Sequence, residues 1–439
     1  MAPNPTIMRA VEHLGYRVTV GDVATQAGLN VNMTEAGLLA LASDAGGHLQ
    51  VAETGEIVYL FPKNFRSILN NKFLRLRLKE WWEKIWKVLF YLIRISFGII
   101  LIASIVLIFV AIAAIMIAAS ASRDDDSGSH DSGGGGMIFM PRFWFGPDIW
   151  WFFYPDYGDR YERRRVASPE KKQMNFLEGV FSFLFGDGNP NADLEERRWS
   201  AIATVIRNNG GAVTAEQIAP YLDETGSGWA KEYEDYMLPV LTKFNGKPEV
   251  SPDGDIVYHF PDLQITAQER NSEAVGAYLR ERPWRFSQAT SGQNMLSAGL
   301  GAVNIVGALV LGSLLRGEVG VQLAQSGGLI AFVQSIYWVL LGYGTAFLAI
   351  PLIRYFWIQF RNKRVESRNQ KRQDRAILLN QANSALQKKI IYAQQFAAKT
   401  VLGRDDLAYT TENDLIEQEI EQSDKIDAEW QRRLNQSGS

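Results

Sequence analysis

The residues of this chain best suited to chemistry are a short acidic run and a few histidines. Three consecutive aspartates at residues 124–126 are followed by His130 and Asp131, and carboxylate and imidazole groups together can attract a divalent cation. A solvated acidic loop is the more frequent meaning of such a run. The histidines are scattered too widely for a local zinc motif, at His13, His48, His130 and His259. We therefore predict no metal site.

The signatures of common enzyme classes are missing from the sequence. It contains no Walker loop, no G-x-S-x-G nucleophile elbow and no H-E-x-x-H zinc motif. It also contains no cysteine, which excludes disulfides, thiolate metal ligands and a cysteine nucleophile. The glycine run at residues 133–136 precedes an aromatic stretch rather than a helix, so it predicts a flexible hinge and not a phosphate cradle. We expect a protein that is not an enzyme and that binds no cofactor.

One short phrase occurs twice, as GEIVYLFP at residues 55–62 and as GDIVYHFP at residues 254–261. The preceding segments, residues 6–24 and 201–219, align at a constant offset of 195 positions, with Gly15 matching Gly210 and Val18 matching Val213. The later phrase needs an offset of 199, so the second copy carries about four extra residues near Thr225. The chain therefore contains one module twice, on either side of an apolar segment.

Each copy predicts a helix, a short helix, a longer helix and a two-stranded ribbon, which is the element order of a winged helix. We assign residues 1–65 and 197–263 to two small α+β winged-helix-like domains, called here the first and second modules. Aromatic rings on the two ribbons are our candidate surface for protein contact, although inward-facing rings of a ribbon usually belong to a core. These rings are Tyr59, Phe61, Tyr258 and Phe260.

The helix that would read DNA in a winged helix lacks positive charge here. Residues 29–47 contain no Lys or Arg and two acids, Glu35 and Asp44, and residues 229–244 set three acids against two lysines. Phosphate neutralisation supplies most non-specific affinity for nucleic acid, so these surfaces disfavour it. The whole chain is nearly neutral, with 45 basic and 48 acidic residues. We expect protein partners. A membrane-tethered transcription regulator is the alternative, and it would need a positive face that only folding assembles.

Three apolar segments are long enough to cross a membrane, at residues 95–118, 294–315 and 329–353. The first has 24 residues without a charge. At about 1.5 Å per residue it exceeds a hydrocarbon core of about 30 Å. A fourth, aromatic segment at residues 137–157 contains Arg142, Asp148 and three prolines, so it is either a broken span or an interfacial belt. We favour the broken span because a cation-rich stretch follows it. The fold class is a mainly α membrane protein with two small α+β domains.

The residues that flank the spans indicate topology. Residues 66–94 predict a basic amphipathic juxtamembrane helix, and residues 354–402 predict a basic C-terminal helix. The positive-inside rule places both on the cytoplasmic or stromal side, where they could contact anionic lipid. Membrane-surface residues expected in the first are Arg75, Arg77, Lys79, Trp81, Trp82 and Trp86. Either residues 137–157 return the chain so that both modules share one side, or the modules face opposite compartments.

The remaining segments connect these elements. They are an acidic and Gly-rich loop at residues 119–136, a basic linker with a short helix at 158–196, a linker at 264–293 and an acidic amphipathic tail at 403–439. The tail could dock onto the basic helix or onto a partner. Small residues four apart predict close helix packing in the second span, at Ala298, Ala302, Ala308 and Gly312. A channel or transporter is a further alternative, but the three spans lack the paired charges it would ordinarily need.

Four phrases resemble a poorly characterised membrane protein family of cyanobacteria and plant chloroplasts. They are MNFLEGVFSFLFGDGNPN at residues 174–191, GGAVTAEQIAPYL at 210–222, GKPEVSPDGDIVYHFP at 246–261 and IEQSDKIDAEW at 420–430. Some plant members of this family are labelled iron–sulfur cluster biosynthesis proteins, but the lack of cysteine argues against a cluster-carrying role here. The resemblance covers most of the chain and brings no catalytic residues.

This resemblance implies a location in a thylakoid or cyanobacterial plasma membrane, with the modules facing the stroma or cytoplasm. Our hypothesis from the sequence is a polytopic membrane scaffold or assembly factor that presents both modules to other membrane proteins. The resemblance alone adds a role in the biogenesis of photosynthetic complexes. Association with a second copy of the chain is also compatible with the sequence.

Overall fold

The computed structural model describes residues 3–124, 174–269, 272–403, 406–414 and eight further positions in the tail. The chain divides into two compact units. The repeat unit comprises Met1–Trp82, Pro190–Pro283 and Arg364–Ser439, and the helix unit comprises Glu83–Asn189 and Trp284–Lys363. The described residues do not include the predicted aromatic segment at residues 137–157. They include only the first residue of the acidic run, Asp124.

The first module begins with α1 (Pro5–His13), β1 (Arg17–Val18) and α2 (Val20–Ala27), followed by α3 (Val31–Ala45), β2 (His48–Ala52) and β3 (Ile57–Leu60). Local chemistry explains the helix ends. Thr19 and Asp22 form a reciprocal capping box at the start of α2, and Gly28 and Gly46 end α2 and α3 in the left-handed conformation. The module extends beyond the predicted residue 65, because α4 (Phe65–Lys72) contributes Phe65 and Leu69 to its core.

The second module has a similar order, with several short helices in place of α3. It contains α8 (Leu194–Asn208), β4 (Ala212–Val213), α9 (Ala215–Ile218), η1 (Ala219–Tyr221), α10 (Trp229–Glu232), η2 (Asp235–Met237), α11 (Leu238–Phe244), β5 (Lys247–Val250) and β6 (Ile256–His259). Both sheets are antiparallel, with the orders β1-β3-β2 and β4-β6-β5. The registers also correspond, because Leu49 pairs with Tyr59 and Pro248 pairs with Tyr258. The two ribbons therefore correspond in strand order and register.

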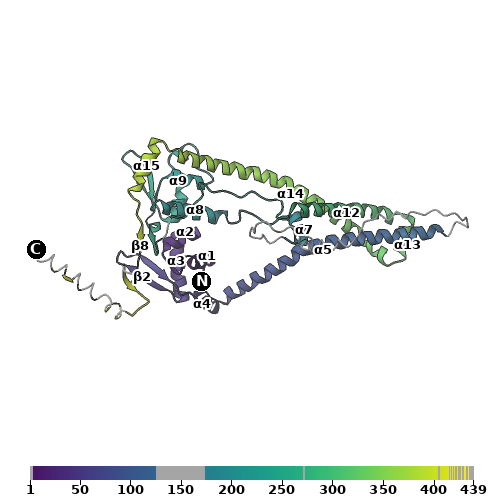
Figure 1. The fold of residues 1–439 in the computed structure, drawn as a ribbon, viewed down its shortest axis with the longest axis horizontal. Helices are drawn as coiled ribbons and strands as arrows, with labels where there is room; N and C mark the ends of the chain where they lie inside the picture. The colour runs from purple at the N-terminus through teal and green to yellow at the C-terminus, as the bar shows by residue number, and fades with distance from the viewer. Residues whose placement is uncertain are drawn as a thin grey trace, which may run out of the picture. The chain divides into compact units, whose positions relative to one another are not determined.

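The two modules share a hydrophobic core. Ala24 and Val31 of the first module belong to the cluster that fills the second. Figure 1 shows α2 beside α8, and the approach is close. A Cβ added at Gly21 would lie 2.1 Å from the carbonyl oxygen of Asp262, and one added at Gly28 would lie 2.9 Å from the backbone nitrogen of Ser200. The modules thus form one body within the repeat unit.

Segments after the second module complete both modules. The strand β7 (Ile265–Thr266) pairs in parallel with β8 (Thr400–Val401), and β9 (Leu407–Thr410) adds an antiparallel strand to the outer edge of β2. Next to β9, Leu49 donates its N–H to Thr411 and accepts from the Thr411 N–H through its carbonyl oxygen. The corresponding residue of the second module is Pro248, which has no N–H to offer. The sequence analysis assigned this stretch to an acidic tail and missed β9.

The helix unit contains the three predicted spans. They lie within α5 (Leu74–Asp124), α12 (Ser291–Leu315) and α14 (Leu329–Asn380), and each is long and apolar enough to cross a membrane. These helices lie side by side in Figure 1. They pack together through Ile108, Leu311 and Val333. Two shorter helices, α7 (Phe176–Phe185) and α13 (Glu318–Gln325), complete the unit.

Two predicted boundaries need correction. Residues 74–94 of the basic juxtamembrane segment and the first span form one continuous helix, α5, whereas residues 66–72 belong to the separate helix α4. The basic segment after the third span likewise continues α14 to Asn380, and α15 (Ser384–Gln394) is a separate helix that begins at the N-cap Asn383. The predicted single helix over residues 354–402 is therefore two helices followed by β8.

The packed face of α12 differs partly from the prediction. Ala308 and Gly312 are buried as expected, but Ala298 is half-buried and Ala302 is exposed. The buried face instead follows helical spacing through Ser297, Gly301, Asn304, Ala308 and Leu311. On this face Asn304 donates a hydrogen bond to Ser104 of α5. The prediction was wrong for Ala298 and Ala302 because each lies one position after a residue of the buried face, Ser297 or Gly301.

We expect Gly301→Leu to destabilise the helix unit by about 1–3 kcal/mol, because overpacking forces neighbouring side chains out of place. A Cβ at Gly301 would lie 2.5 Å from the Phe347 ring, which is 1% exposed. The matched control is Ala302→Leu on the exposed face. Unfolding in detergent, followed by circular dichroism, measures both variants, and equal stabilities would contradict this packing.

Candidate functional site

The repeat unit is held together by buried ion pairs, of which the first centres on Asp22. Its carboxylate is fully buried and accepts hydrogen bonds from the Ala267 N–H at 2.9 Å, the Thr266 hydroxyl at 3.0 Å and the Thr19 N–H at 3.1 Å. Arg207 of α8 supplies the opposite charge. Burial alone would raise the pKa of Asp22, but the charge of Arg207 and these donors outweigh it, and the pKa lies below its ordinary value.

Asp22 therefore joins three segments that are far apart in the sequence. It belongs to α2 of the first module, its cation belongs to the second module, and two of its donors belong to the stretch after the second module. An ionised carboxylate only accepts hydrogen bonds, and this one is supplied with donors and closed to solvent. Its arrangement suits a structural clamp and not an acid or base that meets a substrate.

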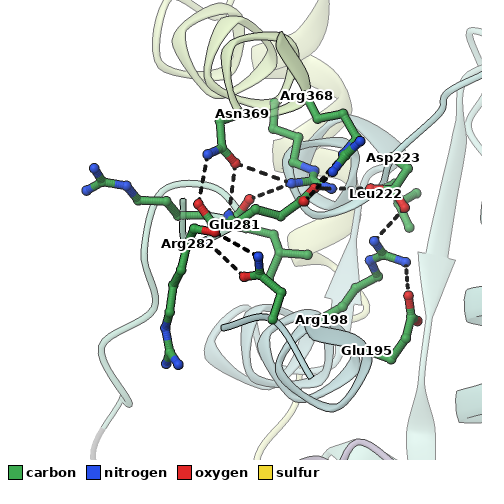
Figure 2. A network of polar contacts seen from close by, with 12 residues as sticks. Glu195, Arg198, Leu222, Asp223, Glu281, Arg282, Arg368 and Asn369 are labelled. Atoms are coloured by element: carbon green, nitrogen blue, oxygen red, sulfur yellow. Dashed lines mark hydrogen bonds and ion pairs between the residues drawn. The ribbon is translucent and has the colours of Figure 1, made fainter. Parts of the chain in front are cut away.

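A second cluster surrounds Arg372 of α14. Figure 2 labels its members Arg198, Asp223, Glu281 and Arg368. Arg372 is 1% exposed and pairs with Asp223 and with Glu281, the latter at 2.8 Å. Arg368 binds both carboxylate oxygens of Glu281, at 2.7 and 2.6 Å, and Arg198 of α8 pairs with Asp223 at 2.5 Å. Burial would raise the pKa of both carboxyl groups, but the arginines hold each pKa below its ordinary value.

Further polar contacts seat this part of α14 on the second module. Asn369 accepts from the Glu281 N–H and donates to the Glu281 carbonyl oxygen, both at 2.9 Å, and Arg375 donates to the carbonyl oxygen of Leu222 at 2.8 Å. The sequence analysis allowed this basic helix a contact with anionic lipid, and that contact stays a prediction. The structure commits Arg368, Arg372 and Arg375 to protein acceptors.

A third cluster, formed by Lys389 with two carboxylates, joins α15 to the second module. The ammonium of Lys389 lies 2.9 Å from Glu216 and 2.6 Å from Glu234, and its side chain is 7% exposed. Burial would lower the pKa of Lys389, but the two carboxylates outweigh it and raise that pKa. Tyr258 donates its hydroxyl to Glu234 at 2.8 Å, and burial raises the pKa of this phenol.

The four candidate contact rings lie inside the modules. Tyr59, Phe61, Tyr258 and Phe260 are 2%, 3%, 3% and 0% exposed and belong to the hydrophobic clusters of their modules. The expectation that they meet a partner is therefore corrected, because a ring on the inner face of a ribbon packs against the helices beneath it. Exposed aromatic residues lie elsewhere, at Trp229 and Tyr233 of the second module. The extra residues near Thr225 were the available signal for them.

The expected membrane-surface tryptophans of α5 are exposed. Trp81, Trp82 and Trp86 are 59%, 59% and 51% exposed, as a membrane interface would require. Arg75, Arg77 and Lys79 lie within α5, but their side chains fall outside the described part of the chain. Whether these residues contact lipid stays a prediction.

One groove of about 700 Å³ lies on the repeat unit between α1, α8 and residues 273–280. Its walls mix charges of both signs, with Arg9, Arg197 and Arg280 beside Glu196 and Glu273. Within the described ranges no three His, Asp or Glu side chains gather as they would around a metal ion. The repeat unit therefore offers a groove that could bind a partner, together with buried charges that are paired within the protein.

Comparison with known proteins finds a relative in a plant. The chain is 41% identical over 442 residues to the protein described as "Uncharacterized protein At5g03900, chloroplastic" of Arabidopsis thaliana, and the match covers 98% of this chain and 82% of the relative. No family model matches the sequence. No solved structure matches it either.

We expect Asp22→Asn to lower the free energy of unfolding by about 3–5 kcal/mol, because it leaves Arg207 beside a buried group without charge. The control is Asp253→Asn, a change of the same chemistry at an exposed turn position. Denaturant unfolding of the purified protein measures both variants. An Asp22→Asn protein as stable as the control would show that the clamp contributes little.

We also expect stability to fall on acidification. The lowered pKa values of Asp22, Asp223 and Glu281 mean that their contribution is fully present above the unfolded-state pKa of about 4 and is lost as pH falls through the lower folded pKa. Arg372→Met removes a cation shared by Glu281 and Asp223, so it should reduce this pH dependence. Unfolding titrations from about pH 7 to about pH 2 test the slope, and an unchanged slope would contradict the assignment.

Proposed function

Because the chain belongs to the family of the chloroplastic Arabidopsis protein At5g03900, we propose that it is a chloroplast-type membrane protein acting as a scaffold or assembly factor. One observation carries this proposal. Two copies of a small module are fused into a single body, and the helices α5 and α14 each continue from this body into an apolar span. A body built in this way presents a fixed protein surface at a membrane.

The proposed module type is a winged helix used for protein contact. The order of elements and the antiparallel ribbon in each module support it. Nucleic acid is a poor ligand, because α3 carries no Lys or Arg, and Lys243 of α11 lies over the Trp199 ring, 4.3 Å from its centroid. Positive charge aimed at phosphates would be required for DNA binding, so a tethered transcription regulator is disfavoured.

Both modules are proposed to lie on one side of the membrane. Their shared core supports this arrangement, because one compact body cannot be divided by a bilayer. The basic residues that begin α5 and follow the third span favour the stromal or cytoplasmic side. The arrangement requires a return crossing between the modules. The broken span at residues 137–157 remains our prediction for that crossing.

Epitope tags test this topology. With one tag before Pro5 and another inserted near Pro190, we expect protease to reach both tags from the same face of sealed vesicles. A matched vesicle preparation of opposite orientation serves as the control and should protect both. Cleavage of one tag with protection of the other would refute the fused arrangement and the scaffold built on it.

A further inference from the structure

The second module differs from the first in the region that precedes its ribbon. The first module has a single 15-residue helix there, α3, whereas the second has α10, η2 and α11, with two glycines of positive φ before them, Gly226 and Gly228. Of these elements, η2 and α11 supply Met237, Val240 and Phe244 to the core of the second module, whereas α10 buries no residue. The turn α10 is therefore available for another purpose.

The extra turns are fixed firmly to the module. Glu234 adopts a left-handed backbone conformation, with φ of 54°, that disfavours residues other than glycine. Its carboxylate accepts from Tyr258 and Lys389, and the next turn buries Met237 to 1% exposure. These contacts hold the backbone in its strained form. A surface held in this way loses little conformational freedom when a partner binds.

The fixed turns present two large aromatic side chains to solvent. Trp229 and Tyr233 stack nearly in parallel, with ring centroids 5.6 Å apart and an interplanar angle of 9°, and they are 74% and 57% exposed. Leu238, five positions after Tyr233 at the start of α11, is 60% exposed. Exposed Trp and Tyr on a rigid base are the residue types that dominate binding energy at protein interfaces. We call Trp229, Tyr233 and Leu238 the aromatic platform.

The charges around the aromatic platform favour a positively charged partner. Glu224, Glu232 and Asp235 are exposed, and Lys231 is the only cation in residues 223–236. This negative surface would repel anionic lipid and nucleic acid, but it would attract Lys and Arg side chains, which also stack on aromatic rings. The protein already uses this contact, since Arg361 lies 4.5 Å from the centroid of the Trp284 ring.

We propose that the aromatic platform binds a segment of a partner protein rich in Lys or Arg, which rests on the proposed scaffold function. The guanidinium or ammonium groups lie over the rings of Trp229 and Tyr233, and Glu232 and Asp235 supply the opposite charge. Apolar residues of the same segment contact Leu238. The basic segment at the membrane edge of a membrane protein has this chemistry.

A labelled peptide of alternating Arg and Leu tests the proposal with the full-length protein in detergent, and a Glu and Leu peptide of equal length is its counterpart. We expect the basic peptide to bind and the acidic one not to bind. The double change Trp229→Ala with Tyr233→Ala should raise the Kd about tenfold or more. Glu232→Gln with Asp235→Asn should raise it severalfold and weaken its salt dependence.

Trp81→Ala is the matched control, because it removes an exposed tryptophan from another element and should leave the Kd unchanged. All altered side chains are exposed, so thermal unfolding should match that of the unaltered protein. Equal binding of both peptides, or an unchanged Kd in the double variant, would overturn the proposal. So would a double variant that loses only its adsorption to phosphatidylcholine vesicles, which would assign the platform to lipid.

Purification from native membranes separates this inference from the scaffold function. If the unaltered protein retains a stoichiometric partner and the double variant loses it, both stand. If the double variant keeps that partner, the platform is wrong and the scaffold stands. If the unaltered protein retains no partner after mild solubilisation, the scaffold function fails, and binding of the basic peptide then reports on the platform alone.

Discussion

The buried ion pair between Asp22 and Arg207 is the interaction on which the repeat unit depends. It places a full negative charge where water cannot reach, which is tolerable only because three hydrogen-bond donors and a guanidinium surround it. These groups come from both modules and from the stretch that follows them. The charge can therefore be satisfied only when all three segments are correctly assembled, and this requirement selects one mutual arrangement of the modules.

The clusters around Arg372 and Lys389 repeat this principle with later parts of the chain. Arg372 belongs to α14 and Lys389 to α15, and each reaches carboxylates of the second module or of the stretch that follows it. The second module is thus surrounded by elements that meet it through paired charges, and the first meets it through a shared apolar core. These contacts connect the second module to α14, to α15 and to the first module.

Features that depend on neighbouring residues in the sequence were predictable. The three apolar helices and the two-stranded ribbon of each module follow from spacing and composition, and the structure contains them. The longer helix predicted before each ribbon is present in the first module, whereas several short helices replace it in the second. Contacts between distant residues were not predictable. No residue near Asp22 in the sequence predicts its contact with Arg207, which lies 185 positions away. The strand β9 forms only against the edge of β2, which is distant in the sequence. The sequence also does not show which face of the ribbon Tyr59 occupies, because this depends on the strand register. The exposed Trp229 could be found only by asking where the copies differ.

The proline at position 248 acquires its meaning from the near-identity of the two ribbons. A chain that carries two similar sheet edges risks adding its last strand to the wrong one, because the main-chain donors and acceptors of an edge are much the same in any sequence. The second ribbon is synthesised closer to β9 than the first. Its edge lacks the N–H that Leu49 offers at the matching place, so mispairing there forfeits a bond that correct pairing makes. The missing N–H at Pro248 thus disfavours addition of the last strand to the nearer ribbon.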